Sequence, residues 1–170
     1  MKDEVRFRIY PDSRQAQAIT RTFGCCRLIY NKGLALCMER DREGREISYP
    51  ELFKMLADLK HDEKFSFLNN ADSDALDRTL QGLIEDYAGY KEGTAPCPSF
   101  KKKRSPCQSY RTGNEQGPIY VTKEGICLPN LGVMKSLPPA EVSGVCFATI
   151  RYVKDEGYYA ALDMEDGQKM

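Results

Sequence analysis

The basic and aromatic side chains of residues 98–114 are the best candidates for binding chemistry. Lysine and arginine neutralise phosphates, and aromatic rings stack on bases. A solvated basic loop with two core aromatics would have the same composition. The aromatic rings on either side of the basic residues, and further arginines on the first predicted strand, favour nucleic-acid binding. The segment PSFKKKRSPCQSYRTGN places Lys101, Lys102, Lys103 and Arg104 between Phe100 and Tyr110, with Arg111 following, and the strand carries Arg6 and Arg8.

Catalytic side chains form no recognisable constellation. The sequence contains neither a Gly-rich phosphate loop with Lys and Ser or Thr nor a GxSxG turn. The single histidine, His61, lies in the polar segment LKHDEKF, which is more typical of solvent exposure than of a general base. The start of a predicted helix explains Asp72 and Asp74, because the helix dipole favours carboxylates there. We therefore expect no complete active site.

The remaining metal-binding residue types also lack a suitable arrangement. Seven cysteines occur without a CxxC pair, and we interpret them as free thiols. Cys97 and Cys107 flank the basic segment, but with only His61 elsewhere they fall short of the four ligands that zinc requires. The adjacent Cys25 and Cys26 are small apolar residues that favour tight packing over redox or metal chemistry. The clustered acids Asp163, Glu165 and Asp166 are expected in a solvated C-terminal tail without a supporting shell.

Charge is unevenly distributed although the net charge is zero. Residues 1–40 and 91–111 are rich in Lys and Arg, whereas residues 41–90 carry twice as many acidic as basic side chains. Two basic stretches are the pattern to expect of a chain that contacts a polyanion at more than one place. No apolar run approaches the roughly 18 residues of a membrane helix, and the N-terminus has no signal-peptide core, so we expect a cytoplasmic protein with no membrane partner.

Hydrophobic periodicity predicts one strand followed by several helices. In residues 4–10, Val5, Phe7 and Ile9 alternate with Arg6, Arg8 and Tyr10, which is the period of a half-buried strand with a basic outer face. A helix is predicted from Asp12 or Ser13 to about Thr22, a break at Gly24, and a second helix over residues 25–40, which together suggest a helix-turn-helix. Further helices are predicted after Ser48 and after Ser73.

The C-terminal part changes to loop and strand signals. Residues 91–106 have the Gly, Pro, Ser and Lys content of a loop, and residues 118–122, 125–128, 145–152 and 158–164 are predicted strands. The order of strand, helices and strands predicts an α+β fold: a small antiparallel β-barrel with helices inserted after its first strand.

Several of these segments also resemble a known family. FRIYPDSRQAQAITRTFGCCRLIYNKGL is similar to the opening of TnpB proteins, also called OrfB, which small insertion sequences encode. SDALDRTLQGLIEDY, SFKKKRSPCQSYRT, ICLPNLGVMK and ATIRYVKDEGYYAAL resemble later segments of the same proteins in the same order. Because the likeness is collinear over nearly the whole chain, it is more specific than any one motif.

The resemblance implies a wedge-like β-barrel and an inserted helical recognition domain of helix-turn-helix character, as in the related type V CRISPR effectors. We assign residues 1–11 to the first barrel strand, 12–92 to the recognition domain, 93–117 to a basic loop and 118–170 to the remaining strands. The family's RuvC-like nuclease and zinc ribbon, with their Mg and Zn ions, would lie outside this truncated chain. We therefore expect no cofactor and no enzymatic activity here.

The family's activity is RNA-guided DNA cleavage, in which base pairing with a transposon-derived guide RNA supplies specificity. The resemblance implies guide RNA as a partner, with target duplex DNA and a separate nuclease chain as further candidates. Residues of the matched segments are the candidate contacts to RNA or DNA: Arg6, Arg8, Arg27, Asn31, Lys32, Tyr49, Phe100, Lys101, Lys102, Lys103, Arg104, Tyr110 and Arg111.

Two alternatives remain open. A stand-alone helix-turn-helix repressor would use residues 25–40 as its reading helix, with Arg27, Asn31 and Lys32 near the helix start. Specific duplex binding without RNA would favour it. A decayed, inactive fragment would instead fold poorly, with an exposed core.

Overall fold

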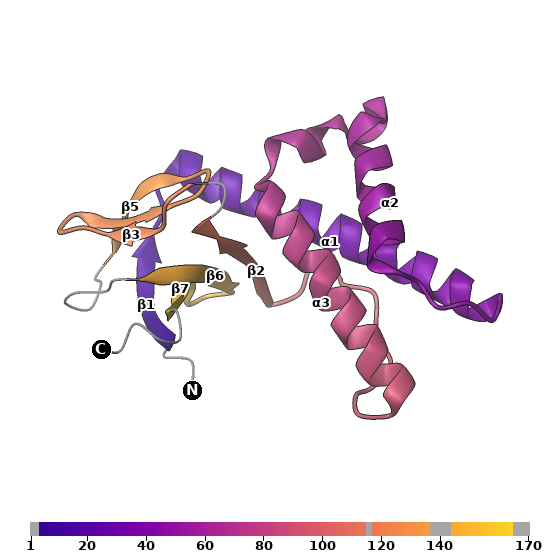
Figure 1. The fold of residues 1–170 in the computed structure, drawn as a ribbon. Coiled ribbons are helices and arrows are strands. Elements are labelled where there is room, and N and C mark those ends of the chain that lie inside the picture. Colours follow the sequence, from indigo (N-terminus) through magenta and orange to yellow (C-terminus); the bar gives the residue numbers. More distant parts are fainter. Residues whose placement is uncertain (1–3, 115–116, 137–143, 165–170) are drawn as a thin grey trace. The chain divides into compact units, whose positions relative to one another are not determined.

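The computed structural model describes residues 4–114, 117–136 and 144–164, and its elements follow the predicted order of strand, helices and strands (Figure 1). The predicted α+β class is confirmed. Of the three acids that we expected in a solvated tail, Glu165 and Asp166 lie outside the described residues. The expectation is wrong for Asp163, which lies in a strand and pairs with Arg111. The elements are β1 (Glu4–Tyr10), α1 (Ser13–Arg42), α2 (Tyr49–His61), the 3-10 helix η1 (Glu63–Asn70), α3 (Ser73–Glu92), β2 (Cys107–Gly113), β3 (Tyr120–Val121), β4 (Gly125–Leu128), β5 (Gly132–Ser136), β6 (Val145–Val153) and β7 (Gly157–Met164).

The chain divides into two compact units, which we treat separately. The sheet unit comprises residues 1–23 and 106–170, and the helical unit comprises residues 24–105. None of the described helices combines the length and hydrophobicity needed to cross a membrane.

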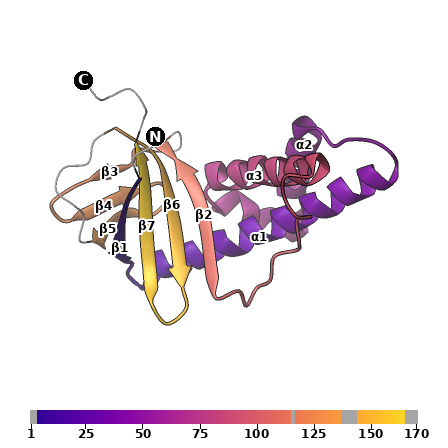
Figure 2. The same ribbon diagram turned by 90° about the horizontal axis from the view of Figure 1, so that it is seen from below.

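The seven strands form one antiparallel sheet in the order β2-β6-β7-β1-β5-β4-β3 (Figure 2). The predicted closed barrel is wrong: among the described residues the sheet is open, and no pairing joins β2 to β3. Closure needs continuous pairing around the barrel, and β3, only two residues long, offers few backbone groups for it. Strand β1 pairs with β5 only through Ile9 and Tyr10, so the connection between the two parts of the sheet is narrow.

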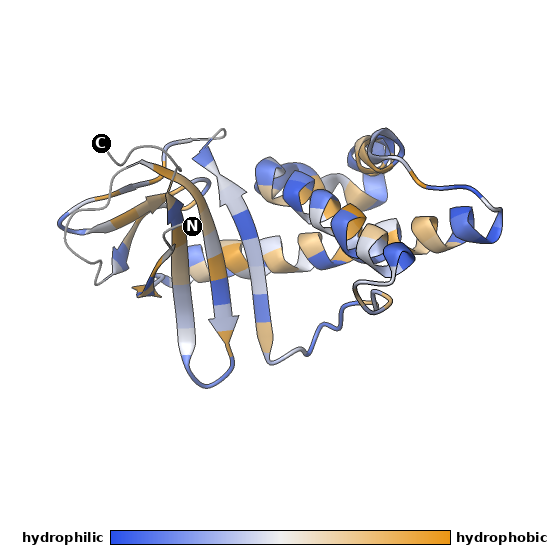
Figure 3. Cartoon of the chain, turned by 60° about the horizontal axis from the view of Figure 1, so that its bottom comes forward, coloured by the Kyte–Doolittle hydropathy of each residue, from blue (hydrophilic) through white to orange (hydrophobic). Residues whose placement is uncertain are grey.

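Helix α1 is continuous from Ser13 to Arg42, so the predicted break at Gly24 is wrong. Gly24 does not adopt the positive φ of a helix-ending glycine. The buried residues Ile19, Phe23, Cys26 and Tyr30 follow one another at spacings of four, three and four. This stripe passes over Gly24, and its burial outweighs the roughly 1 kcal/mol that glycine costs inside a helix. Hydropathy bands alternate along α1 in Figure 3.

Helix α2 begins after the predicted cap Ser48, whereas α3 begins at Ser73 itself and is capped by Asp72, one residue before the predicted position. The Ser48 side chain accepts a hydrogen bond from the Glu51 N–H at the start of α2, and the Asp72 side chain accepts from the Asp74 and Ala75 N–H groups at the start of α3. These bonds satisfy backbone donors that have no partner within the helix. Leu52 and Leu56 of α2 and Leu76, Leu80 and Leu83 of α3 recur at helical spacing and are fully buried.

Two of the observed strands were not predicted from the sequence. Residues 107–113, which we had included in the basic loop, form β2 and pair with β6 along their full length. Residues 132–136 form β5 beside β4. Both segments mix polar residues and glycine with few β-branched residues, so their local signal is weak, and pairing with a neighbouring strand decides their conformation.

The core of the sheet unit lies on one face of the sheet. Phe7, Ile9, Ile150, Ala160 and Leu162 are buried there at alternate strand positions. Gln15, in the first turn of α1, donates from Nε2 to the carbonyl oxygens of Leu131 (3.1 Å) and Val133 (2.9 Å). This amide therefore anchors the start of the helix to the β5 part of the unit.

Candidate nucleic-acid interface

The other face of strands β1, β7 and β6 is polar and partly basic. Side chains alternate between the two faces of a strand, so the residues between the buried ones point outward. The register aligns Arg8, Tyr159 and Arg151 in one row across the three strands. The next row contains Arg6, Ala161 and Thr149. We call these six residues the outward face.

Two predicted contact residues, Arg6 and Arg8, lie on this face and are exposed. The Arg8 Nη2 donates a hydrogen bond to the Glu156 carbonyl oxygen at 2.6 Å, which fixes the guanidinium over the turn between β6 and β7. Gly157 allows this position, because a Cβ at residue 157 would come within 2.8 Å of Arg8 Nη2. Arg8 is therefore held in place at the edge of the outward face.

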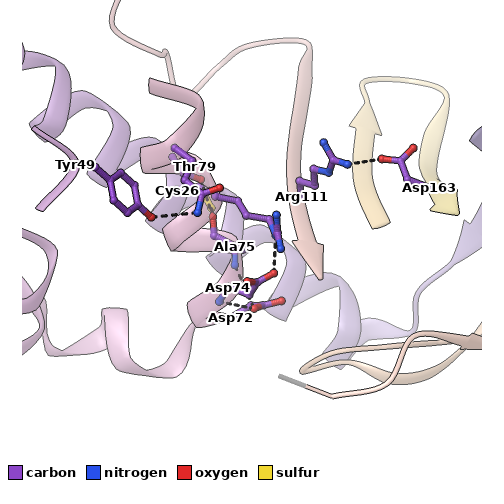
Figure 4. A network of polar contacts seen from close by, with 10 residues as sticks. Cys26, Tyr49, Asp72, Asp74, Ala75, Thr79, Arg111 and Asp163 are labelled. Carbon is purple, nitrogen blue, oxygen red and sulfur yellow. Dashed lines mark hydrogen bonds and ion pairs between the residues drawn. The ribbon is translucent and has the colours of Figure 1, made fainter. Parts of the chain in front are cut away.

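Arg111 has a carboxylate partner. Its Nη2 lies 2.6 Å from Asp163 Oδ2 (Figure 4). Its guanidinium carbon lies 4.6 Å from the centre of the Phe147 ring. Its Nε is buried and makes no hydrogen bond to the described residues. The charge of Arg111 is thus locally compensated, which weakens its attraction for a phosphate relative to an unpaired arginine.

Tyr110, the aromatic residue expected to stack on a base, is a core residue. It is 5% exposed and meets Phe23 edge to face, with 5.5 Å between the ring centres. Phe100, by contrast, is 49% exposed. Of the two rings that flank the basic segment, only Phe100 presents a surface on which a base could stack.

The basic residues of the helical unit are exposed on a loop that is attached to α1. Lys101, Lys102, Lys103 and Arg104 are all exposed. Asn31 Nδ2 donates to the Lys101 carbonyl oxygen at 3.0 Å, and the Lys101 N–H donates to Asn31 Oδ1 at 2.7 Å. The Lys101 ammonium also lies 4.4 Å from the Tyr30 ring centre. Both polar ends of the Asn31 side chain are therefore used to hold the loop.

The other predicted contacts on the helices are half-buried. Arg27 lies one turn before Asn31, and the Lys32 ammonium lies 4.7 Å from the Phe65 ring centre. The Tyr49 ring meets Phe53 edge to face, and burial raises the pKa of the Tyr49 hydroxyl, which accepts a hydrogen bond from Gln81 Nε2 at 3.2 Å (Figure 4). These side chains have local packing roles, whatever else they contact.

Carboxylates at the start of α3 have intramolecular roles. Asp72 caps the helix, and Asp74, which is 5% exposed, accepts a hydrogen bond from Arg78 Nε at 2.7 Å (Figure 4). The buried Cys26 sulfur lies 3.8 Å from the Ala75 carbonyl oxygen. Burial raises the pKa of the Cys26 thiol to about 12, so it is protonated at neutral pH. Packing is the role that we predicted for this cysteine.

Sequence reasoning missed four residues of the outward face: Thr149, Arg151, Tyr159 and Ala161. We recognised their segment only as a strand pair. The available signal was the alternation in ATIRYV, where the buried Ala148 and Ile150 leave Thr149 and Arg151 on the opposite face. Cross-strand register, which the sequence does not contain, then places Arg151 opposite Tyr159.

Comparison with known proteins supports the resemblance. A family model described as a helix-turn-helix domain, of the OrfB type, matches residues 1–46. A protein of Streptomyces pristinaespiralis is 32% identical over 108 residues, which cover 61% of this chain and 26% of that protein. A protein of Escherichia coli K12 is 27% identical over 147 residues, which cover 82% of this chain and 35% of that protein. The Streptomyces protein is named "Putative RNA-guided DNA endonuclease". The Escherichia coli protein is named "Putative RNA-guided DNA endonuclease InsQ". The predicted TnpB/OrfB-like character is confirmed.

This chain spans about a quarter to a third of the length of these relatives. The helix-turn-helix model matches residues 1–46, and the described residues of this range, 4–46, form β1, the single helix α1 and the turn that follows it. Their GCCRLIYN stretch contributes the buried Cys25, Cys26 and Tyr30 and the loop-holding Asn31. In this structure that stretch therefore serves packing and loop placement.

The acidic side chains named above have partners within the chain. Two-metal sites require several acidic side chains around adjacent ions. Asp72 caps a helix, Asp74 pairs with Arg78, and Asp163 pairs with Arg111. Within the described ranges, no group of three or more His, Cys, Asp or Glu residues is placed to hold a metal ion.

Proposed function

We propose that this chain is the nucleic-acid-binding N-terminal part of a TnpB/OrfB-type RNA-guided DNA endonuclease and that it binds guide RNA. The observation that carries the proposal is the match over 82% of this chain to the Escherichia coli relative. Exposed cations on both units support it, since Arg6 and Arg8 come from the sheet and Lys102 to Arg104 from the loop held by Asn31.

The test begins with the RNA that the protein retains. The chain is purified from its host with the flanking locus expressed, washed at moderate salt, and the bound RNA is sequenced. Enrichment of one structured RNA encoded beside the gene is the expected result. Absence of RNA, together with specific binding to duplex DNA, would instead favour the repressor alternative, although α1 contains no separate reading helix starting at Cys25.

Salt dependence then tests which cations contact the RNA. The variant Lys102→Gln, Lys103→Gln, Arg104→Gln should reduce the slope of log affinity against log salt by about 0.7 for each lost phosphate contact. The matched control replaces the exposed cations Arg21, Lys54 and Lys123 with glutamine, which removes the same charge from other places. Equal slopes in the two triple variants would show that net charge alone determines binding.

A further inference from the structure

The outward face contains a small cavity that the sequence did not predict. Its volume is about 330 Å³, which lies in the range of small-molecule sites. The residues around it come from three adjacent strands and the turn between β6 and β7. They are Arg6, Thr149, Arg151, Val153, Glu156, Tyr159 and Ala161.

The strand register explains why the face is hollow at this position. Ala161 pairs with Arg6 on β1 and with Thr149 on β6, so a methyl group lies between a long side chain and a short one. In the adjacent row, Tyr159 pairs with Arg151. The large side chains therefore form walls around a floor made by Ala161.

The cavity combines cationic and aromatic chemistry. The described residues provide no ion pair or hydrogen bond for the Arg151 guanidinium. By contrast, the Arg8 guanidinium, at the margin of the same face, donates a hydrogen bond to the Glu156 carbonyl oxygen. Tyr159 is only partly buried, and it lines the same cavity as Arg151, with which it is directly paired across the strands. Such pairs have Cβ atoms about 5 Å apart. Guanidinium groups bind phosphates, and an exposed ring stacks on a base.

Glu156 adds a hydrogen-bond acceptor to this arrangement. It is the one carboxylate among the residues that line the cavity, and it is exposed on the turn before β7. A carboxylate opposes a bare phosphate but accepts hydrogen bonds from a hydroxyl group. The ribose 2′-hydroxyl is such a donor, and it distinguishes RNA from DNA.

We infer that this cavity binds one unpaired nucleotide of single-stranded RNA, with the phosphate at Arg151 and Arg6, the base against Tyr159 and the 2′-hydroxyl at Glu156. The inference rests on the proposed RNA-binding function and adds the site and the chemical class of its ligand. Duplex RNA does not satisfy it, because a paired and stacked base has no free face for the ring.

The experiment measures binding of a short, unstructured, fluorescently labelled RNA to the 170-residue chain by anisotropy. We expect Tyr159→Leu and Arg151→Gln each to weaken binding by roughly tenfold, and Tyr159→Phe to retain it, because phenylalanine keeps the stacking ring. Arg21→Gln and Tyr120→Leu are the matched controls, since both residues are exposed in the same unit but outside the cavity. They should bind like the unmodified chain.

A second measurement is independent of the effect of the substitutions on folding. RNA carrying a photoreactive uridine is crosslinked to the unmodified chain, and the crosslinked peptide is identified by mass spectrometry. We expect the crosslink within β6 or β7. Crosslinks confined to residues 101–104 would overturn the cavity assignment while leaving the proposed function intact. Failure of the unmodified chain to bind any RNA would remove both.

Two further arms identify the ligand. DNA of the same sequence should bind several-fold more weakly than the RNA, and Glu156→Gln should change this preference. Equal affinity for DNA and RNA would overturn the ribose assignment. Uridine monophosphate should compete only at concentrations far above those of the RNA. If it binds as tightly as the oligonucleotide, the cavity is a site for free nucleotides and the inference is wrong.

Discussion

Asn31 and Lys101 are joined by two hydrogen bonds, one in each direction, although seventy residues separate them along the chain. The amide of Asn31 donates to the Lys101 carbonyl oxygen and accepts from the Lys101 N–H. The Asn31 side chain thus satisfies both backbone polar groups of Lys101, as a neighbouring β-strand would, and fixes the backbone at the start of the basic loop. The same pairing leaves Lys102, Lys103 and Arg104 exposed.

Asn31→Ala should release this loop. We expect the free energy of unfolding to fall by about 1 kcal/mol, because the two bonds are near the surface, and RNA affinity to fall a few-fold as the lysines lose a fixed position. Hydrogen exchange of the Lys101 amide is the direct measurement. Asn31→Asp keeps the acceptor and should protect that amide better than Asn31→Ala does. Unchanged exchange in both variants would mean that the loop is held by other contacts.

Gly33 allows close approach of α1 to α2 and α3. A Cβ at this position would lie 2.6 Å from Leu83 Cδ2 and 3.3 Å from Leu52 Cδ2. Both leucines are fully buried. Gly33→Ala should therefore lower the free energy of unfolding by about 1–3 kcal/mol. Gly82→Ala is the control, because a Cβ there would meet no atom within 4 Å apart from its chain neighbours and the backbone of its own helix. It should raise stability by up to about 1 kcal/mol, as alanine favours a helix. Thermal unfolding of the two variants measures the difference.

The sequence predicted what short-range patterns determine. The alternation of residues 4–10, the cap at Ser48, the placement of Asp72 at a helix start and the leucine spacing of α3 correspond to observed elements. Each of these features depends on residues within one or two turns of one another. The resemblance to TnpB/OrfB proteins was recognised from the order of several segments, and the comparisons with known proteins support it.

Longer-range pairing accounts for the errors. Gly24 looked like a helix break because the local propensity of glycine was given more weight than the buried stripe that passes over it. Closure of the barrel and the existence of β2 depend on which strands meet, and no local pattern contains that information. The same holds for the candidate interface. Arg6 and Arg8 were identified from the sequence, whereas Arg151 and Tyr159 could be identified only from the strand register that places them beside each other.

Tyr87 and Asp41 should make stability sensitive to alkaline pH. The Tyr87 hydroxyl donates to Asp41 Oδ2 at 3.0 Å, and burial, then this carboxylate, raises the pKa of Tyr87 from 10.0 to about 12. Between these values the unfolded chain has lost a proton that the folded chain keeps. Stability from this group is therefore present below pH 10.0 and declines as the pH rises towards about 12.

The variant Tyr87→Phe separates this effect from general alkaline unfolding. It keeps the ring but removes the ionisable hydroxyl, so it should be less stable near neutral pH and lose less stability between pH 10.0 and about 12. Urea unfolding at a series of pH values measures both quantities. A decline as steep as that of the unmodified chain would assign the alkaline sensitivity to other groups, such as the buried Cys26 thiol.

The Arg111–Asp163 pair links stability to charge on the sheet unit. Asp163 is the more buried partner, with a side chain 16% exposed against 39% for Arg111, and the two atoms are 2.6 Å apart. Asp163→Asn should lower the free energy of unfolding by roughly 1–2 kcal/mol, because a charge-assisted hydrogen bond is replaced by a weaker one. It should at the same time raise RNA affinity, since Arg111 then keeps an uncompensated positive charge.

Opposite signs for stability and affinity distinguish this effect from simple damage to the fold, which would lower both. Arg111→Gln removes the cation instead of the anion and should lower stability without raising affinity. In the double variant Asp163→Asn, Arg111→Gln, the gain in affinity should disappear, because no arginine remains to be released. Unfolding in urea and anisotropy titrations with the same RNA complete the cycle. A gain in affinity that persists in the double variant would show that Asp163 repels the RNA directly and that Arg111 takes no part in binding.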